Sequence, residues 1–269
     1  MRGTLRIRAR YSSGGVRAAP APRPRATPRA TPAAGERLIV IVPYRDRAKN
    51  LARLIPALHT HLERVDHRLV VVEQAGDGVF NKGRLLNAGF DLHKHEEAYF
   101  CFHDVDLLPE NADCDYAYPV TPTHVSRYCS QFDYQVPYER IFGGVVLFNR
   151  RDFARVNGYS NAYWGWGCED DDMLRRIAHH GLAAGRRQGR YLSLPHARGW
   201  NQEAVPDAYR RNRTRLRKRY SYLHDGLTTL QYRVAAVSQE AGYVRYLIDV
   251  GGPPALGRGA PLRPRIGRP

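Results

Sequence analysis

The 269-residue sequence predicts an α/β domain in which strands and helices alternate along the chain. Three observations predict this class. The apolar run over residues 38–42 and the segment LVVVE at residues 69–73 are typical of buried strands. A helical pattern of leucines lies between them, and strand–helix–strand order implies a right-handed crossover and a parallel pair. Polar clusters stand where strands end, and ligands bind there in open α/β sheets.

The first half of the predicted domain follows from this pattern. Residues 38–42 form a central strand that Pro43 ends. Apolar residues at helical spacing then predict a helix with a kink at Pro56. After the second strand, residues 82–95 predict a further helix.

The second half supplies two strands and a helix. Residues 98–109 predict a strand that ends in acids, and residues 142–153 a strand that opens with two glycines, where the backbone approaches another group closely. Residues 169–180 predict a helix that Gly181 caps. Its apolar stripe consists of Met173, Leu174, Ile177 and Ala178.

The two ends of the chain differ in composition from the middle. Residues 1–35 hold eight arginines and no acid, and they supply half of the net charge of +16. We interpret residues 1–36 and 253–269 as disordered tails and residues 37–252 as the folded domain. A second basic run over residues 209–220 suits a nucleic acid, an anionic surface, a phosphorylated substrate or a solvated helix face. Nucleic acid is the least favoured partner, because the basic runs lack aromatic platforms on strands.

Targeting and redox features are sparse. No run of 18 apolar residues predicts a transmembrane segment, and no apolar core of a secretory signal is visible, so a cytoplasmic location is predicted. An organellar transit peptide and a disordered arginine-rich tail have the same composition, and both stay open. The four cysteines form no CxxC pair, which predicts free thiols.

Three polar clusters are candidate sites. Tyr44-Arg45-Asp46-Arg47 ends the first strand, and its guanidinium groups suit phosphate. In Asp104-Val105-Asp106, the two carboxylates alternate along the predicted strand, so they can converge on a divalent cation. The alternative for this pair is a turn with two solvated aspartates.

The third cluster is the stretch WGWGCEDDD, residues 164–172. Four adjacent carboxylates repel one another, although the dipole at a helix N-terminus favours negative charge. A carboxylate in a pocket beside Trp166 would be partly desolvated and suited to act as a general base. The alternative is an acidic helix cap, which needs only one or two acids. The indoles offer a stacking face for a sugar, a nucleobase or a mobile lid.

Together these motifs resemble one family. VPYRDR, FNKGRLLNAGF, HDVDLLP, FGGVVLFNRRDFARVNGYSNAYWGWGCEDDD and HDGLTTLQYRV follow one another as in the β-1,4-galactosyltransferases, over residues 37–252. HDVDLLP is similar to the branch that galactosylates xylose. The resemblance implies a single GT-A-like domain, with a Rossmann-like nucleotide-sugar-binding mixed sheet flanked by helices. It also implies a UDP-sugar donor, Mn²⁺ and inversion at the anomeric carbon.

The family's functional residues are carried over by position. Asp170 matches the proposed catalytic base, and Asp106 and His196 match metal ligands. The positions that match the donor site are Pro43, Tyr44, Arg45, Asp46, Arg47, Phe80, Asn81, Lys82 (where arginine is usual), Val105, Asp106, Ile141 and Trp166. Those that match the acceptor site are Cys168, Glu169, Asp170, Asp171 and Tyr209.

Besides Lys82, four positions depart from the family pattern. Ser193 and Leu194 stand where the third metal ligand is expected, so Asp104 or water would complete that set. Cys168 replaces a glycine or arginine. Ile141 replaces the tyrosine that makes the family galactose-selective, and a smaller side chain leaves room for an N-acetyl group.

The sequence therefore predicts an inverting, metal-dependent glycosyltransferase. It would move galactose or N-acetylgalactosamine from a UDP-sugar to a hydroxyl of an acceptor sugar, in a β-1,4 linkage, with Asp170 as the base. Residues 194–215 are expected to form a lid over the donor. A non-catalytic nucleotide-sugar- or carbohydrate-binding module of the same fold is the alternative, favoured by the missing third ligand. The acceptor, a glycan or glycoside, stays open.

Overall fold

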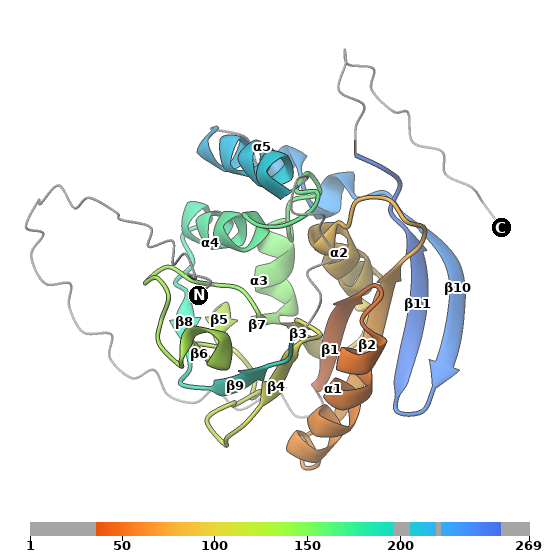
Figure 1. Cartoon of the computed structure of the whole chain (residues 1–269), viewed down its shortest axis with the longest axis vertical. Helices are drawn as coiled ribbons and strands as arrows, with labels where there is room; N and C mark the ends of the chain where they lie inside the picture. Colours follow the sequence, from red (N-terminus) through yellow and green to blue (C-terminus); the bar gives the residue numbers. More distant parts are fainter. Residues whose placement is uncertain (1–35, 196–204, 219–221, 254–269) are drawn as a thin grey trace, which may run out of the picture.

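The computed structural model describes residues 36–195, 205–218 and 222–253, and its centre is an eight-stranded sheet (Figure 1). β1 runs parallel to β2 and β3, whereas β7 is antiparallel to β3, so the sheet is mixed, as the resemblance implies. Across the sheet the strands are β10 (Arg233–Glu240), β11 (Tyr243–Asp249), β2 (His67–Gln74), β1 (Arg37–Tyr44), β3 (Ala98–His103), β7 (Val145–Asn149), β5 (Thr123–His124) and β8 (Gly185–Arg186).

A small second sheet and five α-helices complete the described fold. The second sheet consists of β4 (Leu107–Pro109), β9 (Arg190–Ser193) and β6 (Tyr128–Cys129). The helices are α1 (Ala48–His61), α2 (Lys82–His93), α3 (Arg150–Arg155), α4 (Glu169–His179) and α5 (Val205–Arg217), with 3₁₀ turns at Ser130–Phe132, Tyr222–His224 and Leu227–Thr229. Within the described ranges, no helix has the length and apolar character needed to cross a membrane. The predicted cytoplasmic location stays a prediction.

Apolar side chains fill both faces of the sheet. Ile39 and Ile41 of β1 pack on one side, with residues of α2, α3 and α4. Leu38, Val40 and Val42 pack on the other, with residues of α1 and the small sheet. Successive side chains of a strand point to opposite faces, so a slip of one residue would exchange the two sets. The continuous apolar run therefore fixes a strand that is covered on both faces.

Two predicted strand ends are wrong. β1 continues through Pro43 to Tyr44. The missing N–H of Pro43 costs the β3 ladder nothing, because that ladder ends at Ile41. The strand predicted over residues 98–109 ends at His103, residues 104–106 turn, and residues 107–109 join the other sheet as β4.

The strand predicted over residues 142–153 is also too long. β7 covers only Val145–Asn149, because the Asn149 side chain accepts a hydrogen bond from the Asp152 backbone N–H at 2.8 Å and so starts α3. Pro56, by contrast, lies inside α1 without ending it.

The start of α4 and its glycine cap agree with the sequence, but its apolar stripe does not. Gly181 has φ +69°, and the Leu182 N–H donates to the Ile177 carbonyl at 3.0 Å, which is a Schellman C-cap. Ala178 is exposed. Asp172 and Arg176 are fully buried instead, because they neutralise each other through an ion pair of 2.7 Å.

Residues outside the described ranges include most of both predicted tails, His196 and the first half of the predicted lid. All four cysteines are free and buried, as predicted.

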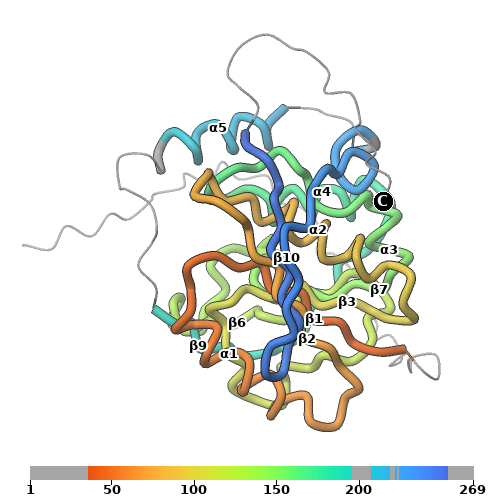
Figure 2. The backbone as a smooth tube through the Cα atoms, turned by 90° about the vertical axis from the view of Figure 1, so that its right-hand side faces the viewer, coloured from red at the N-terminus to blue at the C-terminus, as the bar shows by residue number. Residues whose placement is uncertain are grey.

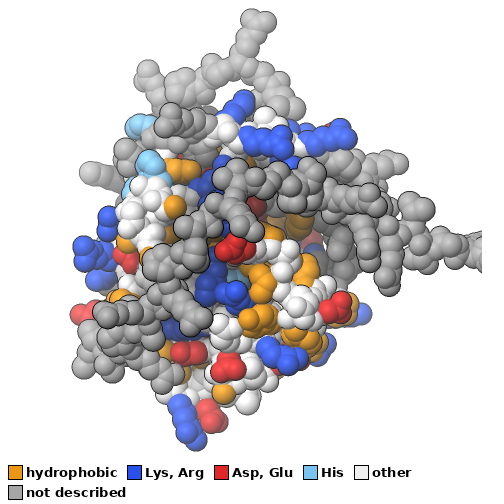
Figure 3. All heavy atoms as spheres, turned by 90° about the vertical axis from the view of Figure 1, so that its left-hand side faces the viewer, with side chains coloured by type: hydrophobic (Ala, Val, Ile, Leu, Met, Phe, Trp, Pro, Cys, Tyr) orange, Lys and Arg blue, Asp and Glu red, His pale blue; other side chains and the backbone are white. Residues whose placement is uncertain are grey.

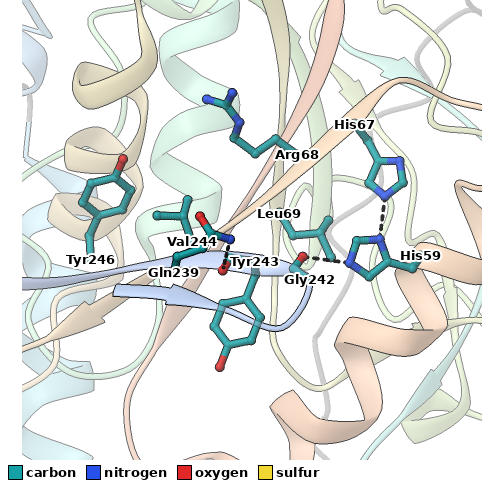
Figure 4. Close-up of a pocket in the computed structure, with 9 residues that line it drawn as sticks. All are labelled: His59, His67, Arg68, Leu69, Gln239, Gly242, Tyr243, Val244 and Tyr246. Carbon is teal, nitrogen blue, oxygen red and sulfur yellow. Dashed lines mark hydrogen bonds between the residues drawn. The ribbon is translucent and has the colours of Figure 1, made fainter. Parts of the chain in front are cut away.

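The β10–β11 hairpin forms one edge of the sheet, and Figure 2 shows it in front of the other strands. Its turn glycine, Gly242, lies against His59 of α1 (Figure 4). His59 Nε2 is 2.7 Å from the Gly242 carbonyl, His59 Nδ1 is 2.9 Å from His67 Nε2, and His67 Nδ1 is 2.7 Å from the Val65 carbonyl. These bonds tie the hairpin to α1 beside a hollow of about 420 Å³ that none of the predicted site residues lines.

Candidate active site

The carboxyl ends of β1 and β3 and the start of β7 meet at one edge of the sheet. β7 is antiparallel, so Gly143 and Gly144, which precede it, stand beside Asp104, which follows β3. The Asp104 N–H donates to the Gly144 carbonyl at 2.9 Å. A Cβ atom added to Gly143 would overlap the Asp170 carboxylate, so this glycine lets α4 bring Asp170 onto the sheet edge.

Each of the four adjacent acids has a partner, and two of them share one. Glu169 and Asp170 face Lys82, with oxygen–nitrogen distances of 3.6 and 3.3 Å. Asp171 accepts a hydrogen bond from the Tyr138 hydroxyl at 3.2 Å. Asp172 accepts from Arg176 in the core. These partners offset the repulsion between the four carboxylates.

Lys82 is the centre of this arrangement. It is the first residue of α2, which Asn81 caps by accepting from the Arg84 N–H at 2.9 Å. Lys82 Nζ also lies 2.9 Å from Asp104 Oδ1, so one ammonium contacts three carboxylates and is only 15% exposed. Burial alone would lower the pKa of Lys82, but Asp104, Asp170 and Glu169 raise it well above its usual value. The ammonium stays charged and draws three distant segments together.

Asp170 has the electrostatics of a proton acceptor. The pKa of Asp170 is raised to about 8: burial, Glu169 and Asp104 raise it, and Lys82 opposes them. Burial also raises the pKa of Glu169, whose Oε2 has no hydrogen-bond partner among the described residues. A carboxylate with a pKa near the working pH is suited to general-base catalysis.

Residues 164–168, here called the tryptophan loop, contact α5. Trp164 is buried with the Arg84 guanidinium 5.0 Å from its ring, whereas Trp166 is 57% exposed and lies 5.3 Å from the Tyr209 ring. The buried Asn212 amide donates to three loop carbonyls, those of Trp164, Trp166 and Gly167, at 3.0 to 3.2 Å. The part of the predicted lid that lies in α5 thus contacts the tryptophan loop.

The loop turns sharply before α4. Gly165, Gly167 and Cys168 all have positive φ, of 75°, 92° and 80°. Cys168 is buried, and burial raises the pKa of its thiol to about 12. The thiol is therefore protonated and does not serve as a nucleophile. Its predicted acceptor contact stays a prediction.

The two predicted donor segments, residues 43–47 and 80–82, contact each other. Arg45 donates to the Gly78 carbonyl, and its guanidinium is 5.4 Å from the Phe80 ring. The Gly165 N–H donates to the Phe80 carbonyl at 2.8 Å, which joins this segment to the tryptophan loop.

The predicted donor residues differ in exposure. Pro43 and Tyr44 are buried in β1, Arg47 is half-buried and Asp46 is exposed. Asn81 is fully buried, and its amide donates to the Asn161 carbonyl at 2.9 Å, so its side chain builds the segment. Ile141 is half-buried next to the two glycines.

The turn after β3 supplies part of a metal site. Asp106 and Val105 are half-buried there, and the Asp106 carbonyl accepts from the Leu194 N–H at 2.7 Å. Ser193 precedes Leu194, and its buried Oγ has no hydrogen-bond partner among the described residues. Those residues contain no group of three His, Cys, Asp or Glu side chains that suits a metal, and His196 lies outside them. The Asp106 carboxylate, the Ser193 hydroxyl and the His196 imidazole together suit Mn²⁺. The Ser193 hydroxyl thus stands at a position where the family pattern has its third metal ligand.

The convergence of Asp104 and Asp106 on one cation stays a prediction. Because the strand ends at His103, the two carboxylates do not alternate along it, and Asp104 contacts Lys82. Sequence reasoning also missed Tyr138 and Asn212, which meet the site only through the fold. Gly143 carried a signal, since two glycines at a strand start indicate close approach.

Gly143→Ala is expected to lower kcat by at least about 10-fold, because a misplaced catalytic group loses much of its effect. The new methyl displaces the Asp170 carboxylate. The free energy of unfolding should change by less than about 1 kcal/mol, because only the end of a side chain has to move. Steady-state kinetics and urea unfolding check both values, and unchanged kcat would contradict the contact.

The chain is similar to known proteins over most of its length. Residues 21–118 match the family model described as the N-terminal region of glycosyl transferase group 7. Residues 123–197 match that described as the N-terminal domain of galactosyltransferase. Human β-1,4-galactosyltransferase 1 is 34% identical over 224 residues, which are 81% of this chain and 56% of that protein. Rat β-1,4-galactosyltransferase 4 is 35% identical over 80% of this chain and 63% of that protein. The chain thus spans little more than half the length of the first of these curated relatives.

Solved structures give the same result. The catalytic domain of Drosophila β-1,4-galactosyltransferase 7, in complex with xylobiose, has a TM-score of 0.69 and 30% identity. The match covers 81% of this chain and 95% of that one. A variant of the Drosophila enzyme in complex with manganese, UDP-Gal and xylobiose has a TM-score of 0.68, with 29% identity and the same coverage. These likenesses confirm the predicted fold class.

Proposed function

Since the chain belongs to the β-1,4-galactosyltransferase family, we propose that it transfers galactose or N-acetylgalactosamine from a UDP-sugar to a hydroxyl of an acceptor sugar, with inversion. The observation that carries this proposal is the environment of the Asp170 carboxylate. Its carboxylate is buried at the sheet edge, and its pKa is raised to about 8. A solved relative in complex with manganese, UDP-Gal and xylobiose supports the choice of substrates.

In this reaction Asp170 accepts the proton of the acceptor hydroxyl. The hydroxyl oxygen forms a bond to the anomeric carbon on the face opposite UDP, and the bond from that carbon to the phosphate oxygen breaks. Lys82 holds Asp170 in place and also contacts Asp104. The exposed Trp166 ring offers the sugar a stacking face.

The metal site is part of the proposal. Asp106 and His196, with the Ser193 hydroxyl, would hold Mn²⁺. The metal, when bound, stabilises the negative charge that develops on the departing UDP. Arg45 and Arg47 supply positive charge within the donor segment of residues 43–47.

UDP release tests the function. UDP-galactose and UDP-N-acetylgalactosamine are each incubated with xylosides, glucosides and N-acetylglucosaminides, with Mn²⁺ or with EDTA. We expect UDP release that needs both an acceptor and Mn²⁺. Binding of UDP-sugar without release would favour the second candidate, a non-catalytic binding module, which the replacement of the usual third ligand by Ser193 supports.

The pH dependence of kcat/KM should report Asp170. The base must be deprotonated, and because its pKa is raised, the active fraction falls as the pH drops through about 8. Below that pH the logarithm of kcat/KM should fall with unit slope. Lys82→Met should move this limb to higher pH, because Lys82 lowers the pKa of Asp170. Lys49→Met, at an exposed site, is the control, and an acid limb near pH 4 would contradict the assignment.

Donor choice rests on Ile141. We propose that its small side chain admits the N-acetyl group and favours UDP-N-acetylgalactosamine. Ile141→Tyr should move the kcat/KM ratio of the two donors towards galactose by at least about 10-fold, whereas Ile141→Val should leave it nearly unchanged. Competition between the two donors measures the ratio, and an unchanged ratio in Ile141→Tyr would reject this role.

A further inference from the structure

The edge of the sheet that carries Asp104 continues past β7. β5 is antiparallel to β7, and β8 is parallel to β5, so both end at the same edge as β3. Arg127 stands three residues after His124, the last residue of β5, and Arg186 is the last residue of β8. His124 and Arg186 are partners in register. Two arginines thus stand where ligands of such sheets bind.

Neither arginine has an acidic partner among the residues that the structure describes. Within residues 36–195, 205–218 and 222–253, Arg127 and Arg186 form no ion pair, and the only acid outside those ranges is Glu203. The Arg127 guanidinium lies 5.9 Å from the Tyr128 ring, and that of Arg186 lies 5.2 Å from the Phe142 ring. Arg127 Nε is buried and has no hydrogen-bond partner among the described residues. The neighbouring Arg187 differs, because it pairs with Asp115 at 3.7 Å.

The two guanidinium groups are close enough to affect one another. Burial lowers the pKa of Arg186, and the charge of Arg127 lowers it further. Burial, Arg186 and Arg127 together lower the pKa of His124 to about 3, so that ring stays neutral. Two like charges without a counterion destabilise the protein locally, and an anion between them would offset this.

This pair adjoins the candidate active site through Gly143. His124 Nε2 lies 2.9 Å from the Gly143 carbonyl, which also accepts a hydrogen bond from Ser126 Oγ at 3.0 Å. Neighbouring strands are about 5 Å apart, so Arg127 and Arg186 stand roughly 5 to 10 Å along the edge from Gly143. That distance suits the unit attached to the reacting acceptor sugar. Figure 3 shows the left-hand side of the view in Figure 1, where Lys and Arg side chains lie beside hydrophobic ones.

We propose that Arg127 and Arg186 form an anion subsite, which binds an oxyanion group on the unit attached to the acceptor sugar. Planar guanidinium forks hold carboxylate, sulfate or phosphate oxygens through paired hydrogen bonds, and Arg127 and Arg186 are both only half-buried. The proposal rests on the proposed function and narrows its acceptor to acidic glycosides. The transfer step itself is unchanged.

Matched acceptors test the subsite. 4-Carboxyphenyl and 4-carbamoylphenyl β-xylosides have the same shape but differ in charge, and a 4-sulfophenyl xyloside separates carboxylate from sulfur oxyanions. We expect kcat/KM for at least one anionic xyloside to exceed that of the neutral one by about 10-fold or more, since charge-assisted hydrogen bonds are worth that much. This preference should decrease with added salt.

Variants assign the preference to the two residues. Arg127→Gln and Arg186→Gln should each lower the anionic-to-neutral ratio, and the double variant should bring it to about 1. Turnover of the neutral xyloside should stay within about 2-fold, because neither residue contacts Asp170 or Lys82. Arg64→Gln, an exposed arginine near the end of α1, changes the net charge equally and should leave the ratio intact.

The outcomes separate this proposal from the proposed function. A ratio near 1 in the wild type, or a preference that persists in the double variant, would overturn the subsite while leaving transferase activity in place. If none of the xylosides releases UDP, calorimetry with the same compounds still decides. Tighter binding of an anionic xyloside to the wild type than to the double variant supports the subsite, and equal binding overturns it.

Discussion

Replacing Asp170 with asparagine is expected to lower kcat by at least about 10²-fold, because a positioned general base contributes about 10²–10⁴-fold. The amide has nearly the shape of the carboxylate but cannot accept the acceptor's proton. Asp170 also contacts Lys82 at 3.3 Å, and that contact can persist with the amide oxygen. The loss should therefore be chemical, and UDP binding should survive.

Initial rates of UDP release and calorimetry with UDP and Mn²⁺ separate these effects. Asp133→Asn is a matched control, because Asp133 is exposed and its positive φ of 51° is one that asparagine adopts. A variant of Asp170 with undiminished turnover would remove the base from the mechanism. Equal loss of UDP binding and turnover would instead indicate that Asp170 holds the donor.

Arg176→Met should lower the free energy of unfolding by about 3–5 kcal/mol, the usual cost of removing one partner of a buried ion pair. Arg176 is 0% exposed and donates to Asp172 Oδ2 at 2.7 Å and to the Asp225 carbonyl at 2.6 Å. Methionine fills much of the space, but it leaves the Asp172 carboxylate buried without its cation.

Urea unfolding of Arg176→Met measures this loss, with Arg151→Met as the control at an exposed position. Adding Asp172→Asn to Arg176→Met should recover part of the stability, because the uncompensated charge is then gone. A loss below about 1 kcal/mol would show that the core tolerates the unpaired carboxylate. Expression at low temperature keeps the variant measurable.

Local periodicity predicts much of the fold. Strands covered on both faces leave a continuous apolar run, which is why β1 and β2 were found, and glycine at a helix end marks the cap of α4. The turn at residues 104–106 was missed because apolar residues continue on both sides of it. Which sheet a short apolar segment joins depends on partners distant in the sequence, and no local pattern records them.

The candidate site divides in the same way. Asp170 and Trp166 could be predicted because they belong to the motif WGWGCEDDD, whose residue types and order indicate the chemistry. The contact of Lys82 with Asp104 and Asp170 joins residues 22 and 88 positions apart, so it exists only in the folded chain. Arg176 was hidden for another reason, since a charged residue on a helix is ordinarily exposed.

The two imidazoles behind the β10–β11 turn impose a hydrogen count. His67 Nδ1 and His59 Nε2 both face carbonyl oxygens, which only accept, so each of these nitrogens must carry a hydrogen. The bond between the rings needs a third hydrogen, whereas two neutral rings hold only two. When all three bonds form, the pair therefore carries one positive charge, shared by His59 of α1 and His67 of β2. Nitrogen-15 spectra of the two rings would reveal that extra hydrogen directly.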